Sequence, residues 1–345
     1  MATVKSNFKK CFYFFTTNFV IIGLIVAVDD LQEFHTENIK QNKTHYQYTA
    51  RIFKARFISF FSKYGARIHI NTFKLDNDKT MQYGIIKMQD LVQDLKLWET
   101  LYCSSFLMRP YQKLQECPEI ESAQQNNLIS ATALAGILTK NGESEMEFYK
   151  NIVSIPHYKT YSSIFQLVDN EDPDLLVKDK LEGFRDIYDP ILKSAFKDEM
   201  SIENGLFKKD ESDSVTKYLL SNLNDNVYQN MYTVMSPLKY DPEKKFHKKV
   251  LDEKSYDLID SKTSLMTEDN LAKKCNRSID KILLAHRNSK ILLILISGPF
   301  LFALYVVKYS IKILILYILY KKNKKVTDSN KKDDSKDSVS EEITA

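Results

Sequence analysis

Glycine is scarce in this chain. Only eight glycines occur among 345 residues, at positions 23, 65, 84, 136, 142, 183, 205 and 298. Even the closest two, at 136 and 142, are six residues apart. The GxGxxG and GxxxxGK[ST] loops need clustered glycines, because backbone N–H groups must closely approach a phosphate. The spacing therefore excludes both of these nucleotide-binding loops.

Cysteine is also scarce, and charge of either sign is not in excess. The four cysteines (Cys11, Cys103, Cys117 and Cys275) form no CxxC pair and have no histidine at metal-ligand spacing, which argues against a zinc site or a disulfide framework. Basic and acidic residues number 49 and 45, giving a net charge of +4, and 43% of residues are hydrophobic. This composition indicates one large or two modest globular domains and excludes collagen-like, coiled-coil and wholly disordered classes.

The first apolar stretch has two interpretations. Residues 11–28 carry no charge, follow three lysines and precede Asp29 and Asp30. A basic start, an apolar run and the small residue Ala27 are typical of a secretory signal peptide, which composition alone slightly favours. A buried central strand that ends in two carboxylates has the same pattern, since Val20–Val28 is short and rich in β-branched residues.

A second apolar stretch covers residues 291–320 and is interrupted by Lys308 and Lys312, with four further lysines at 321–325. With a signal peptide, it would make a single-span secretory-pathway surface protein whose basic end lies in the cytosol. The lysines, however, fall on one narrow stripe at helical spacing, which is also compatible with a helix lying on a membrane surface.

Between these stretches the pattern predicts a folded α/β region followed by helices. Two helices joined by a link at 42–46 are expected over residues 31–64, and strands at 66–71 and 81–86 are expected across a turn at 76–79. An amphipathic helix is expected from about residue 85 to 102. Further helices are predicted at 121–139, 143–154, 174–199 and 212–235, then a polar linker at 236–264 and a disordered tail from 323.

A run of polar residues directly after the first apolar stretch reads H-x-x-N-x-x-x-N-x-x-H-Y. Because it follows a strand that ends in two acids, the pattern resembles that of the mitochondrial phosphatidate cytidylyltransferase family, also called the mitochondrial translocator assembly and maintenance family. The residues that carry it are Asp29, Asp30, His35, Asn38, Asn42, His45 and Tyr46.

The resemblance continues in chain order to about residue 197 and more weakly over 286–322. Each motif alone is weak, and their shared order gives the specificity. The matches are Gly65–Asn71 with G-A-G-V-Y-F-N, Tyr83–Ile86 with Y-G-V-V, Leu91–Tyr102 with L-x-x-D-L-x-x-W-x-x-L-Y, Arg109-Pro110 with K-P, Asn127–Ala131 with N-L-x-S-A, and Phe184–Leu192 with F-x-x-L-Y-x-P-x-L.

The resemblance implies an α/β fold: a polymerase-β-like nucleotidyltransferase domain, then a helical, winged-helix-like domain and a C-terminal apolar and basic membrane-associated helix. We expect the first domain at 1–115, with an incomplete N-terminus, and the helical domain at 116–235. A polar linker and helix at 236–284, the membrane-associated helix at 285–322 and a disordered tail at 323–345 follow.

The resemblance also implies an activity. Members join CTP to phosphatidic acid, releasing pyrophosphate and forming CDP-diacylglycerol for cardiolipin synthesis. They act at the matrix side of the mitochondrial inner membrane. Mg²⁺ is the implied cofactor, because it neutralises triphosphate charge and orients the displacement. We therefore expect CTP, phosphatidic acid and inner-membrane lipids as partners, peripheral attachment to that membrane, and no nucleic acid.

The implied site residues each have a structural alternative. Asp29 and Asp30 are expected to bind the metal, or to cap the helix that follows. His35 and His45 are the expected catalytic residues, or hydrogen-bonded structural ones. Substrate contacts are expected from Asn38, Asn42, Tyr46, Asn71, Tyr83 and Arg109, although Asn71 also suits a turn and Arg109 a solvated charge. Asp94 and Trp98 are expected to serve helix packing.

Several departures from the family pattern affect residues that would carry charge. Gly23 stands where the family strand has a metal-binding aspartate, Gln82 replaces a lysine, and Phe106 replaces an arginine. The family's S-Y-x-G-D-x-R segment is Pro156–Ser162 here, and its glycine-serine loop has no counterpart in residues 1–22. Either the chain starts late, or it is a diverged relative with impaired catalysis that acts as a matrix-side membrane scaffold. A late start accounts for the loop but not for Gly23 or Phe106.

Overall fold

The computed structural model describes residues 10–17, 21–46, 48–63, 66–74, 80–157, 172–235, 261–263 and 266–296. The turn expected at 76–79, nearly all of the linker at 236–264 and the stretch from 297 onward lie outside the described residues. The chain divides into two units, residues 1–290 and 291–345. No helix within the described ranges has both the length and the apolar character needed to cross a membrane.

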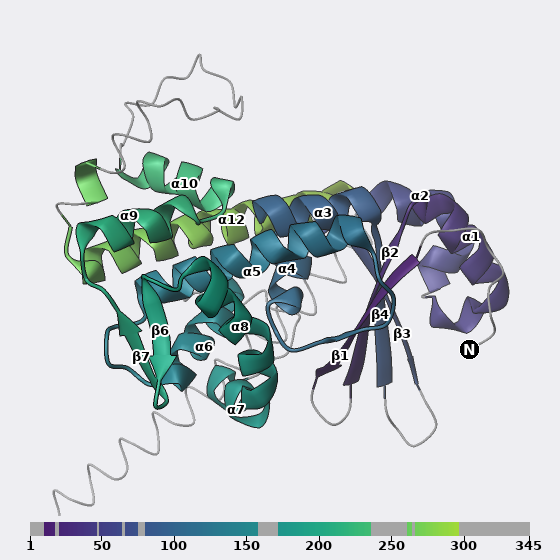
Figure 1. Ribbon diagram of the computed structural model, residues 1–345. Coiled ribbons are helices and arrows are strands. Elements are labelled where there is room, and N and C mark those ends of the chain that lie inside the picture. The colour runs from purple at the N-terminus through teal and green to yellow at the C-terminus, as the bar shows by residue number, and fades with distance from the viewer. Residues whose placement is uncertain are drawn as a thin grey trace, which may run out of the picture. The chain divides into compact units, whose positions relative to one another are not determined.

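A five-stranded mixed sheet forms the first part of the chain (Figure 1). The strand order is β3-β4-β2-β1-β5, and only β2 and β4 are parallel. Residues 11–28 are therefore not a cleavable leader: they form most of β1 and all of β2, and β2 is hydrogen-bonded on both sides. The buried-strand interpretation is confirmed. The strands are β1 (Lys10–Thr17), β2 (Ile21–Val28), β3 (Ile68–Lys74), β4 (Thr80–Lys87) and β5 (Gln112–Lys113).

The two faces of the sheet are covered by different helices. Alternate residues of a strand point to opposite faces, and in β2 both sets are buried. Leu24, Val26 and Val28 pack beneath α1 (Leu31–Gln41), and α2 (Tyr48–Phe61) packs against α1 after a 3₁₀ turn, η1 (Lys43–His45). Ile25 and Ala27 pack beneath α3 (Met88–Leu97), α4 (Tyr102–Leu107) and α5 (Pro118–Leu138).

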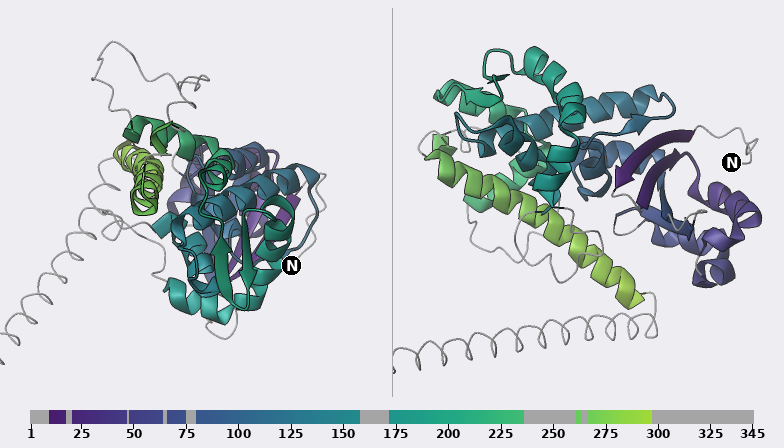
Figure 2. Two further views of the ribbon diagram at one scale, coloured as in Figure 1. Left: turned by 60° about the vertical axis from the view of Figure 1, so that its left-hand side comes forward. Right: turned by 90° about the horizontal axis from the view of Figure 1, so that it is seen from below.

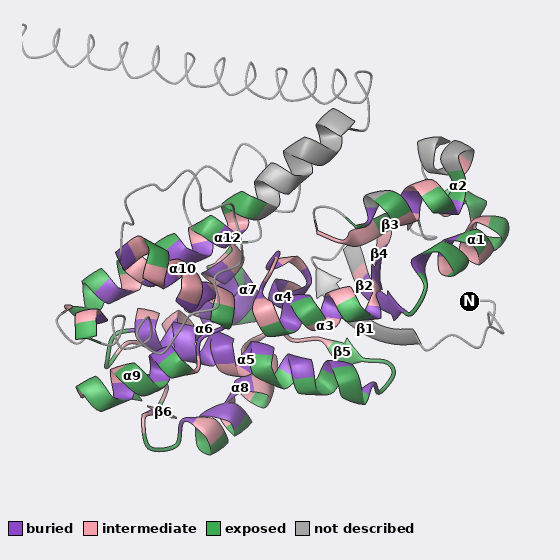
Figure 3. Ribbon diagram, turned by 90° about the horizontal axis from the view of Figure 1, so that it is seen from above, coloured by how far each residue is buried: buried purple, intermediate pink, exposed green. Residues whose placement is uncertain are grey.

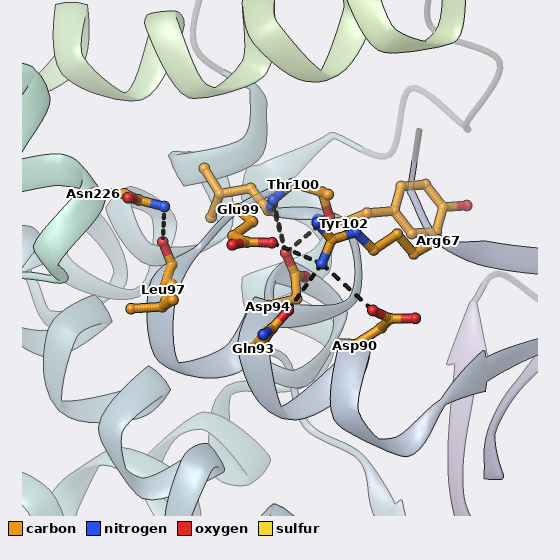
Figure 4. Close-up of polar contacts among 10 residues, drawn as sticks. Arg67, Asp90, Gln93, Asp94, Leu97, Glu99, Thr100, Tyr102 and Asn226 are labelled. Atoms are coloured by element: carbon orange, nitrogen blue, oxygen red, sulfur yellow. Dashed lines mark hydrogen bonds and ion pairs between the residues drawn. The ribbon is translucent and has the colours of Figure 1, made fainter. Parts of the chain in front are cut away.

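The single helix expected from residue 85 to 102 is wrong. Strand β4 continues to Lys87, α3 ends at Leu97, and Trp98 and Leu101 adopt positive φ values of 49° and 56°. The buried Asp94 carboxylate explains this break, because it accepts five hydrogen bonds from the turn and from the start of α4. Their donors are the N–H and hydroxyl of Thr100 and the N–H groups of Leu101, Cys103 and Ser104, at 2.8–3.2 Å. Figure 4 shows Asp94 beside Thr100.

The packing roles expected for Asp94 and Trp98 are confirmed. The buried Trp98 indole donates to Asn127 Oδ1 on α5 at 2.8 Å, and Asn127 donates in turn to the carbonyl of Ser104 at 3.1 Å. At the end of α3, the carbonyl of Leu97 accepts a hydrogen bond from the side chain of Asn226 (Figure 4). The α3–α4 turn thus joins the sheet to the helical part of the chain.

The helical part contains more elements than the sequence predicts. The helix expected at 174–199 is two helices, α7 and α8, and a small hairpin follows that the sequence did not reveal. The hairpin residues alternate too briefly for a strand pattern to be recognised. The elements are α6 (Glu145–Ser154), η2 (Ile155–His157), α7 (Pro173–Asp179), α8 (Leu181–Ala195), β6 (Met200–Glu203), β7 (Leu206–Lys209), α9 (Asp213–Ser221), α10 (Asp225–Met235) and α12 (Glu268–Ile296).

Helix α12 runs along the other helices (Figure 2). Its buried residues recur every three or four positions and join the largest hydrophobic core: Leu271, Cys275, Ile279 and Ile282. Lys209, at the end of β7, connects the start of α12 to α5. The Lys209 ammonium donates to the carbonyls of Gly136 and Thr139 at 3.1 and 3.4 Å, and lies 2.9 Å from the Glu268 carboxylate.

Candidate functional site

A polar cluster fills the space between α1 and the sheet, and we call it the Asn38 cluster. It gathers seven of the ten residues singled out from the sequence, together with His69 of β3. Its members are His35, Asn38, Asn42, His45, Tyr46, His69, Asn71 and Tyr83. The H-x-x-N-x-x-x-N-x-x-H-Y spacing produces it because His35, Asn38 and Asn42 recur on one face of α1.

Asn38 is the centre of this network. Its amide donates one hydrogen bond to the Tyr46 hydroxyl at 2.7 Å and one to the Tyr83 hydroxyl at 2.9 Å. Each hydroxyl also forms a hydrogen bond with a histidine: Tyr46 with His35 Nδ1 at 2.9 Å, and Tyr83 with His45 Nδ1 at 3.0 Å. Either member of each pair can donate, since a neutral imidazole carries its proton on Nδ1 or on Nε2 and a hydroxyl both donates and accepts. Asn38 Oδ1 accepts from the Asn42 amide at 2.8 Å, so the hydrogen-bonding capacity of Asn38 is used within the cluster.

Burial keeps the two inner histidines neutral. His35 is fully buried, and desolvation, followed by the neighbouring His69, lowers the pKa of His35 to about 3. Desolvation lowers the pKa of His69 to about 4, although a hydrogen bond to Asn71 acts in the opposite direction and raises this pKa. Burial also raises the pKa of Tyr46 and Tyr83, with Asn38 and Asn71 opposing the shift. The cluster therefore holds neutral rings at neutral pH.

His45 lies at the margin of the cluster. Its ring stacks on Phe73 of β3, with ring centroids 4.1 Å apart and planes 3° from parallel. Partial burial lowers its pKa, and its side chain is partly accessible. Among the two predicted catalytic histidines, His45 is thus the one a substrate can reach.

Asp29 and Asp30 lie outside the cluster, at the end of β2. The Asp30 side chain accepts the backbone N–H of Glu33 at 2.9 Å, so it caps α1, as its structural alternative predicts. Both residues are exposed. Gly23, where the family pattern has an aspartate, lies six residues before Asp29, about 20 Å along an extended strand. The two positions are therefore too far apart to hold one metal ion.

Gly23 and Arg109 belong to the opposite face of the sheet. Gly23 follows the alternation of Ile25 and Ala27 and lies in register with Gln82 of β4. Phe106 packs against the core on this face, and the Arg109 guanidinium lies 5.6 Å from the Phe106 ring centroid. The sheet thus separates Arg109 from the Asn38 cluster.

The helical part of the chain fixes the backbone around Arg109. The buried Tyr188 hydroxyl of α8 donates to the carbonyl of Met108 at 2.7 Å, and Gln124 of α5 donates to the carbonyl of Leu107 at 2.6 Å. A Cβ atom on Gly183 would lie only 2.8 Å from Pro110 Cβ, so glycine permits this close approach. An open cavity of about 680 Å³ adjoins the segment, lined by residues 110–112 and 178–183.

The described residues do not assemble a metal centre. Nowhere in the described ranges do three or more His, Cys, Asp or Glu side chains converge as metal ligands. Mg²⁺ is often held by one or two carboxylates together with substrate phosphates. Asp29 and Asp30 match that number, but one oxygen of Asp30 already caps α1. They also lie far from Gly23, so the donor set does not fit an ion on the Gly23 face.

Comparison with known proteins identifies the class. A family profile described as "Phosphatidate cytidylyltransferase, mitochondrial" matches residues 15–311, which is most of the chain. The chain therefore belongs to the mitochondrial phosphatidate cytidylyltransferase family, a nucleotidyltransferase family, and its mixed, mostly helical α/β structure is that of a member.

Individual relatives carry the same name. The *Danio rerio* protein is 32% identical over 178 residues, covering 50% of this chain and 52% of the relative. The *Saccharomyces cerevisiae* protein is 31% identical over 179 residues, with coverages of 50% and 46%. The *Homo sapiens* protein is 26% identical over 222 residues, with coverages of 63% and 48%. The matched part thus spans about half the length of these relatives.

Sequence reasoning missed one member of the cluster, His69. The signal was present, because His69, Asn71 and Phe73 are alternate residues of one strand and so share a face. His69 lies within the strand expected at 66–71, at a position where the G-A-G-V-Y-F-N pattern has a tyrosine.

Proposed function

We propose that the protein is a phosphatidate cytidylyltransferase. An oxygen of the phosphatidic acid phosphate attacks the α-phosphorus of CTP, the bond from that phosphorus to the β-phosphate oxygen breaks, and CDP-diacylglycerol and pyrophosphate leave. The observation that carries the proposal is the family match over residues 15–311, in a chain whose H/N/Y motif forms one connected network.

The two groups of predicted site residues cannot surround the same phosphates, because the sheet lies between them. We propose that the nucleotide binds on the Gly23 face, where Arg109 offers a guanidinium suited to phosphate. The residues that follow Arg109, 110–112, line an open cavity together with residues 178–183. The Asn38 cluster then has a positioning role, holding β3 and β4 against α1. A catalytic role for His45 and a substrate contact for Asn42 would instead require the nucleotide to bind on the α1 face, and they form the competing hypothesis in the test below.

Mg²⁺ would neutralise triphosphate charge if it accompanies CTP. The described carboxylates do not meet on the Gly23 face, so they supply no donor set for the ion there. The poor fit between these carboxylates and a Mg²⁺ ion favours a second candidate function. In that function the protein is a catalytically impaired member that serves as a matrix-side membrane scaffold, since Gly23 and its in-register neighbour Gln82 carry no charge where the family pattern has an aspartate and a lysine.

One experiment separates the two functions. The full chain is incubated with labelled CTP, Mg²⁺ and phosphatidic acid, and labelled CDP-diacylglycerol is quantified. The enzyme proposal expects product, and expects Arg109→Ala to raise KM for CTP more than it lowers kcat. Product no higher than in a protein-free control would leave only the scaffold function.

The finer architecture and location belong to the same proposal. We infer a polymerase-β-like domain over 1–115 and a helical, winged-helix-like domain over 116–235, the latter supported by the β6–β7 hairpin among helices α5 to α10. We also infer peripheral attachment to the matrix side of the mitochondrial inner membrane, supported by the relatives' names and by the basic, apolar sequence at 285–322.

A further inference from the structure

Residues 38–75 contain no acidic side chain. The 38 residues between Glu37 and Asp76 hold eight lysines and arginines, in a chain whose net charge is only +4. This basic segment covers the end of α1, all of α2 and β3. Its basic residues are Lys40, Lys43, Arg51, Lys54, Arg56, Lys63, Arg67 and Lys74.

Helix α2 is broken at Lys54, which adopts φ 62° and ψ −172°, and its second part, residues 55–61, presents one inner and one outer face. Ala55 and Ile58 are buried, and Ile58 packs with Tyr46 against α1. Arg56 and Phe60 recur at a spacing of four on the opposite side, and Lys63 follows three residues later, just beyond the helix. All three are exposed, and the Phe60 side chain retains 47% of its accessible surface. Figure 3 shows α2 beside α1, on the other side of the sheet from α3 and α5.

Some cations of the basic segment are committed elsewhere. Arg67 lies 2.7 Å from the Glu99 carboxylate, Lys40 pairs with Glu37, and Arg51 donates to the carbonyls of Tyr46 and Thr44. Four others differ: within the part of the chain that the structure describes, no carboxylate lies at ion-pair distance from Lys43, Lys54, Arg56 or Lys63. The outer side of α2 therefore carries uncompensated positive charge around an exposed aromatic ring.

We propose that the outer face of α2, formed by Arg56, Phe60 and Lys63, docks on an anionic phospholipid bilayer. Phe60 enters the boundary between headgroups and acyl chains, and the cations contact lipid phosphates. A helix face that combines cations with a half-exposed aromatic ring fits an interfacial membrane helix. Single-stranded nucleic acid is instead bound by several aromatic platforms along a basic groove.

The docking proposal rests on the proposed function in one respect: an enzyme that acts on phosphatidic acid needs a surface that binds the membrane containing this lipid. Binding to vesicles is measured without turnover, so it can hold or fail independently of cytidylyl transfer. The basic, apolar stretch at 285–322 is a separate segment, and the tests below therefore report from α2 itself.

The direct test uses fluorescence from Phe60→Trp in the full chain. The natural protein has one tryptophan, Trp98, which is fully buried and so inaccessible to lipid quenchers. Vesicles of brominated phosphatidylcholine mixed with phosphatidylglycerol should quench the new tryptophan. The matched control is Leu175→Trp on α7, at a side chain that is 56% exposed, which should not be quenched. An unquenched Phe60→Trp, whether or not the protein sediments with the vesicles, would overturn the proposal.

Charge reversal gives an independent readout. Arg56→Glu with Lys63→Glu should weaken partition into phosphatidylglycerol-containing vesicles by about fivefold for each cation removed. Lys193→Glu with Lys217→Glu makes the same change in net charge at exposed positions of α8 and α9 and should have little effect. If both double variants lose the same amount of vesicle partition, the effect would come from overall net charge, and the docking surface would be contradicted. A response of Phe60→Trp to an RNA oligonucleotide but not to vesicles would reassign the surface to nucleic acid.

Discussion

The side-chain amide of Asn38 donates a hydrogen bond of 2.9 Å to the hydroxyl of Tyr83, 45 residues further along the chain. This bond ties α1 to β4, and a second bond from the same amide ties it to Tyr46. A single side chain thus holds both tyrosine–histidine pairs.

Replacing Asn38 by leucine should destabilise the fold. The change removes both donors, leaves two tyrosine hydroxyls short of a partner and should lower the free energy of unfolding by about 2 to 4 kcal/mol. Urea denaturation followed by circular dichroism measures it. Asn42→Ala, which removes one bond at the margin, should cost about 1 kcal/mol. A smaller loss for Asn38→Leu than for Asn42→Ala would show that the network is not centred on Asn38.

Acid should weaken the fold below about pH 6.5. The pKa values of His35 and His69 are about 3 and about 4 in the folded chain, below the ordinary value of 6.5. As pH falls from 6.5 towards 4, the unfolded chain therefore binds protons that the folded chain does not, and stability falls. Each histidine contributes at most about 1.4 kcal/mol per pH unit.

Urea midpoints at several pH values between 7 and 4.5 test this linkage, and His69→Gln supplies the comparison. Removing one of the two buried rings should reduce by about half the pH dependence of the unfolding free energy that His35 and His69 contribute together. An unchanged slope in His69→Gln would mean that the acid sensitivity arises at other groups.

Asp94→Asn should be among the costliest isosteric changes in the sheet part of the chain. The amide group would turn a donor toward N–H groups that now donate to the carboxylate, and we expect a loss of about 3 kcal/mol. Asp90→Asn is the matched control, because Asp90 makes a long 3.5 Å ion pair with Arg67 and its loss should cost under about 1 kcal/mol. Thermal denaturation of both variants distinguishes the two roles, and similar midpoints would contradict a special role for Asp94.

Gly23→Asp should increase cytidylyl transfer if the missing carboxylate limits it. The new side chain would share the face of Arg109 and lie beside Gln82, so the effect should grow in the double variant with Gln82→Lys. CDP-diacylglycerol formation is measured as a function of Mg²⁺ concentration. Gly23→Asn is the control for size. If Gly23→Asn matches Gly23→Asp, the gain does not come from a carboxylate.

The sheet and most helices follow from local patterns. The β-branched run before Asp29 predicts a buried strand, and the structure confirms it as β2. The sequence could not reveal that residues 10–17 pair with β2, because an uninterrupted apolar run gives no periodicity to separate two strands from a leader. The break after Leu97 is equally hidden, since Asp94 stabilises it through bonds to residues further along the turn.

The candidate site, too, could be predicted from the sequence only in part. Helical spacing brings His35, Asn38 and Asn42 together, and strand alternation adds Asn71 and Tyr83. The side of the sheet on which each group lies depends on the register of β2 and β4, which no single segment encodes. For this reason the sequence assigns Arg109 and the histidines to one site, whereas the sheet keeps them apart.

Lys209 has a consequence for chemical labelling. Its ammonium group is almost completely buried, with two carbonyls and the Glu268 carboxylate as partners, one for each of its hydrogens. An amine-reactive reagent should therefore modify the exposed lysines around it long before it modifies this one. The rate at which Lys209 is modified, measured by mass spectrometry in the unaltered protein, should therefore report how often α12 detaches.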